Sequence, residues 1–271
     1  MLNNFIYSSP TWLWGAVLVL AFVTMATIGL VVFNQVVQID VRKSHNDVTG
    51  FTIAIIAVTY AVLLAFIAVA TWETYSRADE IVDSEASYVG NIYRDTVGLQ
   101  GDVGRDIRAD LQEYVRIVVE EEWPTQRRGE VPSAAWTPLY RAHAAIVTLH
   151  PQNLGESVIE AELLRTLNEL YGARASRISA TDGHIPDVVW WLILLGGMIT
   201  TGYMYLFGFH SFRMHLVMTA AVSASLALVV VLIMALDWPF RGQVSITPDA
   251  FLQVQQSWSQ MHLDKPNPDK P

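Results

Sequence analysis

Four long stretches without a charged residue constrain this chain more than any other feature of its sequence. They cover residues 11–33, 50–72, 188–209 and 216–236, and none contains Asp, Glu, Lys or Arg. A helix needs about 20 apolar residues to cross the hydrocarbon core of a bilayer. A charge near the bilayer centre costs several kcal/mol, so the absence of charged residues also indicates that these stretches span a membrane. The sequence therefore predicts an integral membrane protein with four transmembrane helices.

The charge of the chain lies mainly between the second and third stretches. Residues 73–185 hold 19 of the 26 acidic and 11 of the 17 basic residues, so they carry −8 of the net charge of −9. No basic patch is available to release counterions from phosphates, which argues against nucleic acid as a partner. The chain has no cysteine, which excludes disulfides and Cys-ligated zinc.

The acidic segment has helical periodicity throughout and no alternating stretch that would indicate a sheet. The second membrane helix is expected to run on into water to about residue 93. Further helices are predicted at 102–123, with Asp102 as N-cap and Pro124 as its end, and at 134–149 and 155–176. In the last of these, apolar residues recur at helical spacing and are expected to face inward, namely Val158, Ile159, Leu163, Leu167 and Leu170.

These observations predict an all-α membrane protein with four transmembrane helices in two pairs and a helical extramembrane domain inserted between helices 2 and 3. The expected divisions are a first helix pair at 1–72, an acidic domain continuous with helix 2 at 73–185, a second pair at 186–236 and a C-terminal tail at 237–271. No basic residue precedes the first stretch, so we expect a retained helix rather than a signal peptide. Residues 265–271 are polar and rich in proline, which predicts disorder.

An even number of spans places both termini and the acidic domain on one side of the membrane. The short loops on the other side contain Arg42, Lys43 and Arg213, and this bias favours an extracytoplasmic domain. On the domain side, the basic residues that flank the membrane have many acidic residues near them in the sequence. These basic residues are Arg77, Arg174, Arg177 and Arg241.

No catalytic, cofactor or metal motif is present, so we do not expect an enzyme. A membrane-proximal charged cluster follows the second stretch and consists of Glu73, Arg77, Asp79, Asp83 and Glu85. Asp79 and Asp83 share a helix face and offer oxygen ligands for a divalent cation, but a solvated face is the expected arrangement. The same holds for Glu120, Glu121 and Glu122, and for His210 and His215, which flank a short loop without a third ligand.

Several short runs, taken in order, resemble a known family. They are HNDVTG at 45–50, YAVLLAF at 60–66, WE at 72–73, Glu85-Ala86, Tyr93-Arg94, EWP at 122–124 and DWPFRG at 237–242. The combination resembles the bacterial bestrophin-like domain family of unknown function, and it spans nearly the whole chain. The resemblance implies a multi-pass protein of the bacterial inner membrane, distantly similar to the pentameric bestrophin anion channels. The calcium-binding acidic cluster of bestrophins has no counterpart here, so calcium gating is not implied.

The resemblance also implies a homo-oligomer, a pentamer if it assembles as bestrophins do, in which the second helix lines a pore for chloride or another small anion. One face of that helix has small hydroxyls and apolar side chains at three- and four-residue steps, which suit such a pore. Its candidate pore-lining residues are Thr52, Ile56, Thr59, Leu63, Phe66 and Ala70. Bestrophin topology would put the domain in the cytoplasm, opposite to the charge bias. The alternative function is a non-conducting membrane module that senses or recruits a partner through the acidic domain.

Overall fold

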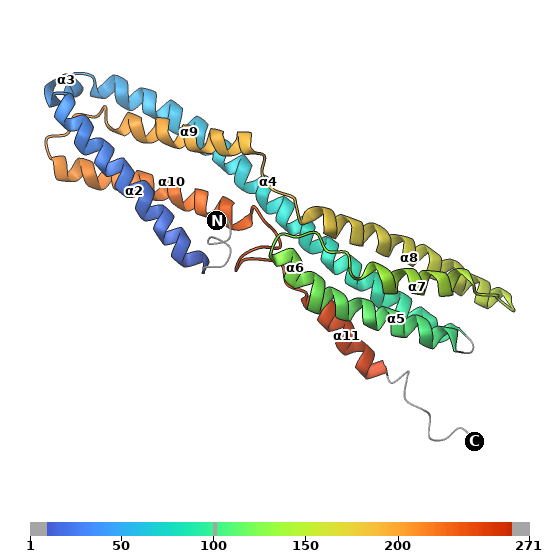
Figure 1. The fold of residues 1–271 in the computed structure, drawn as a ribbon. Coiled ribbons are helices and arrows are strands. Elements are labelled where there is room, and N and C mark those ends of the chain that lie inside the picture. Colours follow the sequence, from blue (N-terminus) through green and yellow to red (C-terminus); the bar gives the residue numbers. More distant parts are fainter. Residues whose placement is uncertain (1–9, 100–101, 262–271) are drawn as a thin grey trace. The chain divides into compact units, whose positions relative to one another are not determined.

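We describe the fold from a computed structural model in which residues 10–99 and 102–261 are placed. All regular elements of these residues are helices (Figure 1). They are α2 (Thr11–Val36), α3 (Ile39–Lys43), α4 (Asn46–Asp95), η1 (Thr96–Gly98), α5 (Val103–Ile117), η2 (Val118–Glu122), α6 (Trp123–Arg127), α7 (Trp136–Val147), α8 (Leu154–Ala180), α9 (Asp187–Met204), α10 (Phe212–Leu236) and α11 (Asp249–Met261). The predicted disordered tail at 265–271 lies outside the described residues.

Four helices are long and apolar enough to cross a membrane, and they confirm the predicted spans. They are α2, the first part of α4, α9 and α10, and the all-helical class with a helical domain inserted between the second and third spans is also confirmed. In the most apolar window of α2 and of α4, only 11% of the residues are buried within the chain. Most of the surface of both helices is therefore left for lipid or for other copies to cover.

The chain divides into two compact units. Unit 1 contains Met1–Tyr75, His184–Trp238 and Gly242–Val244, and unit 2 contains Ser76–Gly183, Pro239–Arg241 and Ser245–Pro271. Unit 1 thus holds the spans, and unit 2 holds the extramembrane helices. Helix α4 belongs to both, since it continues without a break to Asp95.

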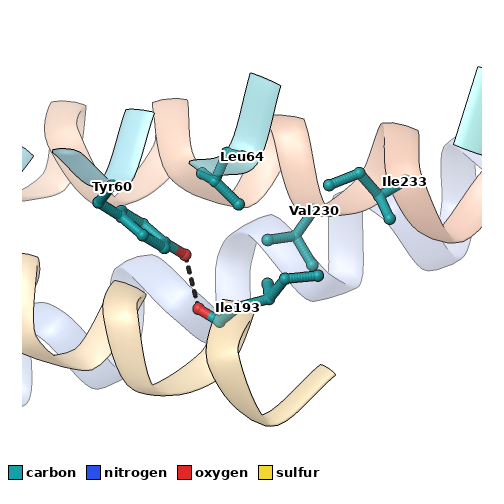
Figure 2. Packing of buried hydrophobic residues seen from close by; sticks show 5 residues of the cluster. All are labelled: Tyr60, Leu64, Ile193, Val230 and Ile233. Carbon is teal, nitrogen blue, oxygen red and sulfur yellow. Dashed lines mark hydrogen bonds between the residues drawn. The ribbon is translucent and has the colours of Figure 1, made fainter. Parts of the chain in front are cut away.

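The core of unit 1 is built by α4, α9 and α10. Figure 2 shows Tyr60 and Leu64 from α4 against Ile193 from α9, with Val230 and Ile233 from α10. The hydroxyl of Tyr60 donates to the carbonyl of Ile193 at 2.5 Å, which satisfies the only polar atom of that ring inside an apolar layer (Figure 2). Helix α2 completes the bundle by packing along α10.

Unit 2 is a helical bundle in which α7 packs on α5 and on α8, and α11 packs on α5. Leu111, Leu139 and Leu163 from three of these helices are fully buried. The sequence analysis did not identify α11. This helix buries Phe251 and Trp258, and Trp258 stacks on Tyr93 of α4 with ring centroids 4.3 Å apart.

Two predictions about the helices of unit 2 are wrong. Pro124 does not end a helix, because the chain passes through the π-helical turn η2 and Pro124 falls in the first turn of α6, where its missing N–H costs nothing. Asp102 is the N-cap residue of α5 as predicted, although its carboxylate pairs with Arg105 and makes no capping hydrogen bond. Val158 is 61% exposed, because it lies near the start of α8, before the turns that other helices cover.

The loop end of unit 1, defined as α3 together with the α9–α10 connection, is held by side chains. The amide of Asn46 donates to the carbonyl of Gly208 at 3.1 Å and accepts from its N–H at 2.9 Å. His215 was expected to be solvated, but α10 begins before it at Phe212, and its buried Nε2 lies 2.8 Å from the carbonyl oxygen of Met204. His210 is exposed as expected.

We predict that Gly208→Ala destabilises unit 1. A Cβ at this position would lie 2.5 Å from the backbone nitrogen of Lys43, so two backbone segments would have to separate. Overpacking of this kind costs about 1–3 kcal/mol. Gly202→Ala is the matched control, because no atom lies within 4 Å of the Cβ it would add. Thermal unfolding in detergent should show a lower midpoint for Gly208→Ala alone, and equal midpoints would contradict this account.

Candidate functional site

The six candidate pore-lining residues lie along one strip of α4, beside its buried face. That buried face is formed by Tyr60, Leu64 and Thr71. Within the chain, Thr59, Phe66 and Ala70 are exposed, whereas Thr52, Ile56 and Leu63 are half-buried. Phe66 is the largest of the six and is 72% exposed, so no helix of the same chain covers its ring.

The polar atoms of this strip are already engaged. The hydroxyl of Thr59 donates to the carbonyl of Ile55 at 2.9 Å, one turn back in the helix. Thr74, further along α4, donates to the carbonyl of Ala70 in the same way at 3.0 Å. Because the hydroxyl hydrogen of Thr59 is used within the helix, this part of the strip presents mainly methyl groups and apolar side chains.

A pocket with a volume of about 350 Å³ lies at the C-terminal end of this strip, within unit 1. Phe66 and Ala70 belong to its lining, together with Thr71 and Thr74 from α4. The rest of the lining comes from the start of α9, from the end of α10 and from the residues beside them, including His184, Ile185 and Asp237. The pocket is mostly apolar, and the carboxylate of Asp237 is its one acidic group.

Asp237 holds the two ends of the second helix pair together. Its carboxylate accepts from the backbone N–H of Ile185 at 2.7 Å, and the ring of His184 stacks on that of Trp238 with centroids 4.9 Å apart. Burial raises the pKa of Asp237 above its ordinary value, although the Ile185 amide acts in the opposite direction. This is the first residue of the DWPFRG run, so one of the family motifs lies at this pocket.

The residues of the membrane-proximal charged cluster predicted from the sequence do not share one environment in the structure. Glu73, Arg77, Asp79 and Asp83 are exposed, but Glu85 is completely buried. The described residues contain no group of three His, Asp or Glu side chains that could hold a metal ion. The expectation of a solvated face is therefore wrong for Glu85.

Glu85 forms one half of a buried charge cluster in unit 2. Its carboxylate pairs with the guanidinium of Arg177 from α8, with Nε–Oε2 and Nη2–Oε1 distances of 2.6 and 3.1 Å. The hydroxyl of Tyr114 from α5 donates to the same carboxylate. Burial, followed by the nearby charge of Glu85, raises the pKa of Tyr114, so this phenol stays protonated as a donor.

Glu122 forms the other half of the cluster and corrects the expectation that it lies on the surface. It is 1% exposed, and Arg174 donates to it through two bonds of 2.6 and 2.9 Å. Arg177 bridges to it at 3.1 Å, and the N–H of Ala135 donates at 2.9 Å. Glu121, by contrast, is exposed as predicted and pairs with Arg116.

The four charges balance, and aromatic rings enclose them. The guanidinium of Arg174 lies 4.5 Å from the centroid of Trp136, and that of Arg177 lies 5.5 Å from Trp123. Gln126 accepts from Arg177 and donates to Thr181 at 2.8 Å. Almost every donor and acceptor is thus paired, as a buried ionic network requires.

The sequence analysis missed Arg174 and Arg177 as cluster members and assigned them to the flanks of the membrane. A usable signal was present, because both continue the buried face of Leu163, Leu167 and Leu170 at three- and four-residue steps. In the folded protein both arginines are buried and paired with the carboxylates of this cluster.

We predict that Arg177→Leu strongly destabilises unit 2. The change leaves the carboxylate of Glu85 buried without its cation, a situation that costs about 3–5 kcal/mol. Arg165→Leu is the matched control on the same helix, because Arg165 pairs only with exposed carboxylates and should contribute about 1 kcal/mol or less. Thermal midpoints in detergent test this, and similar losses in both variants would contradict the role assigned to the cluster.

We also predict loss of stability in acid through Glu122. Burial alone would raise its pKa, but the hydrogen bonds and charge of Arg174 and the charge of Arg177 leave the pKa below its ordinary value of 4.5. A carboxylate with a lowered pKa stabilises the fold above about pH 4.5, and this contribution fades as the pH falls through the folded-state pKa.

The midpoint of the wild type should therefore fall between pH 7 and pH 3.5 by more than that of Glu122→Gln, which has no proton to take up at this position. Glu120→Gln is the control, because Glu120 is exposed and pairs with Arg116 on the surface. It should retain the full wild-type drop. An equal drop in all three proteins would exclude Glu122 as the titrating group.

Comparison with known proteins agrees with the fold. Two crystal structures of a bacterial bestrophin homologue from Klebsiella pneumoniae, one of them a single-residue variant, both align with a TM-score of 0.66. The variant is 14% identical and covers 90% of this chain and 97% of its own; the other is 13% identical and covers 93% and 99%. At such identities the likeness establishes the fold alone.

No match was found among curated proteins. The family model described as Bestrophin-like domain matches residues 20–251, which include most of the first span, the other three spans and nearly all of the described part of unit 2. The match also includes Glu85, Glu122 and Asp237, the acidic residues of the buried cluster and of the pocket. The chain therefore belongs to the Bestrophin-like domain family.

Proposed function

We propose that the protein is a homo-oligomeric anion channel of the bacterial inner membrane, with the candidate strip of α4 lining its pore. The observation that carries the proposal is the exposure of this strip in a single chain. Phe66 is 72% exposed, and Thr59 and Ala70 are exposed beside it. Within a single copy, Thr52 and Ile56 are half-buried and Leu63 packs against the core of unit 1, whereas Phe66 and Ala70 are left uncovered. A pore lined by this strip therefore requires other copies to enclose it.

The chemistry of the strip supports an anion with weak hydration. The six residues carry no charge, whereas pores selective for cations commonly use rings of Asp or Glu. A narrow apolar segment imposes a dewetting barrier, which is lowest for ions that release water easily. Chloride and the larger halides fit that requirement. The resemblance to bestrophins favours a pentamer, and each copy would contribute the pocket that Phe66 lines.

The test is anion flux through purified protein in liposomes. Phe66→Ala should raise the chloride flux, because removing the ring shortens the apolar constriction. Lowering the barrier by about 1 kcal/mol would raise the flux about fivefold. Leu20→Ala is the matched control, since Leu20 on α2 is also apolar and 65% exposed but lies outside the proposed pore.

The oligomeric state of each preparation should be measured in parallel by light scattering. An assembled wild-type oligomer that passes no anion would contradict the channel and favour the partner-recruiting module. Equal effects of Phe66→Ala and Leu20→Ala on the flux would be compatible with a channel but would contradict the proposal that α4 lines its pore.

A further inference from the structure

The pocket of about 350 Å³ in unit 1 combines an apolar lining with one buried carboxylate. Its apolar walls include Ile67 from α4, Val189 from α9 and Leu236 from α10. Asp237, the residue after Leu236, is 7% exposed and is the one acidic residue of the lining. None of the described residues that line the pocket is Lys or Arg. The pocket thus has the size of a small-molecule site and holds a negative charge that no Lys or Arg of the lining neutralises.

The groups that hold Asp237 leave its charge in place. Its carboxylate accepts from the backbone N–H of Ile185 at 2.7 Å and from the side chain of Trp190, and both donors are neutral. His184 is the one titratable neighbour in the lining, and its ring stacks on that of Trp238 with 5° between the ring planes. Burial, the largest effect, raises the pKa of Asp237, whereas the charge of His184 acts to lower it. A carboxylate offers about four lone-pair sites, so Asp237 retains room for a further donor.

Other hydrogen-bonding groups of the lining have already used their hydrogens. The hydroxyls of Thr71 and Thr74 each donate to a carbonyl one turn back in α4, at 2.8 and 3.0 Å. The N–H of Val189 donates to the carbonyl of Pro186 at 2.9 Å, and Pro186 itself has no N–H. A hydroxyl whose hydrogen is engaged still has lone pairs on its oxygen. These groups therefore offer acceptors rather than donors, which suits a ligand that donates hydrogen bonds.

The place of the pocket in the chain suits a molecule with one apolar and one charged end. Phe66 contributes an exposed ring to the lining, and the face of such a ring attracts an ammonium group. Trp190 and Trp191 lie in the first turn of α9, and Trp238 follows α10. Tryptophans at the ends of spans are typical of the membrane–water interface. A ligand here would have its apolar part towards the spans and its charge at their ends.

We propose that this pocket binds a small amphipathic amine, with the ammonium group on the carboxylate of Asp237 and the apolar body between α4, α9 and α10. An anionic ligand would be repelled by the carboxylate, and a neutral one would leave its charge unpaired. A phospholipid with an amine headgroup fits less well, because its phosphate would lie against the same carboxylate and acceptor oxygens. The site shares Phe66 and Ala70 with the candidate pore-lining strip, but its charge recognition depends on Asp237.

Tryptamine, tryptophol and indoleacetate are matched probes, because they share an indole body and end in an ammonium, a hydroxyl and a carboxylate. A ligand of the folded state raises the thermal midpoint of the detergent-purified protein. At about pH 8, where amines are charged, tryptamine should raise it by about 2–4 °C once its concentration reaches about fivefold its dissociation constant. Tryptophol should bind about tenfold more weakly or worse, since it lacks the charge-assisted hydrogen bond, and indoleacetate should have no effect.

Asp237→Asn should weaken tryptamine binding by about tenfold or more, because the amide still accepts from Ile185 but carries no charge. Asp187→Asn is the matched control, since Asp187 is exposed in the first turn of α9 and lies outside the lining, and it should bind tryptamine as the wild type does. A brominated tryptamine soaked into wild-type crystals should give an anomalous peak inside the pocket. This measurement and the probe series hold even where Asp237→Asn fails to fold.

Equal affinities for tryptamine and tryptophol, an unchanged tryptamine affinity in Asp237→Asn, or a bromine peak elsewhere would overturn the proposal. Nanodiscs of phosphatidylethanolamine and of phosphatidylcholine test a lipid as the source of the amine. A midpoint that rises with the ethanolamine lipid but not with tryptamine would assign the pocket to a headgroup and overturn the small amine. None of these outcomes depends on whether the protein conducts.

Discussion

The bilayer offers no partner for a polar group, and the arrangement of this protein depends on that constraint. Each backbone amide in a span must bond within its own helix, and each side chain must be apolar or satisfied locally. Thr59 and Thr71 of α4 meet this demand by donating to a carbonyl one turn back, and Tyr60 meets it by donating to Ile193. Charge is thereby displaced to the ends of the spans and to unit 2, where it is handled in three distinct ways.

On the surface of unit 2, charges form solvent-exposed ion pairs, as between Arg165 and its two glutamates. In the interior of the same unit, two carboxylates and two guanidiniums neutralise each other among aromatic rings. At the loop end of unit 1, the buried Arg42 donates to Asn34 and to the Tyr205 carbonyl, and among the described residues it forms no salt bridge. The first arrangement contributes little to stability, whereas the second fixes which faces of α4, α5 and α8 meet. The third holds a guanidinium in place through neutral groups.

The spans could be predicted from sequence because an uncharged, apolar run of about 20 residues is typical of a helix that crosses a membrane. The burial of individual charges could not, because composition does not distinguish a glutamate in water from one beside an arginine far along the chain. Glu85 and Arg177 are 92 residues apart, and only the tertiary fold joins them. Helix α11 was missed for a related reason. Its apolar residues Phe251, Val254 and Trp258 do recur at helical spacing, but the surfaces that bury two of them come from distant residues, Trp123 for Phe251 and Tyr93 for Trp258.

The π-helical turn η2 sets the helical phase of α6, which follows it without a break. Glu122 faces inward, four residues after the buried Val118, while Glu120 and Glu121 face outward to Arg116. Deleting a single residue between Val118 and Glu122 would leave the composition and charge of the chain almost unchanged. The same deletion would turn α6 by about 100° relative to α5, and Trp123 would leave its place beside Arg177. The length of this segment is therefore as strictly determined as the identity of the residues in it.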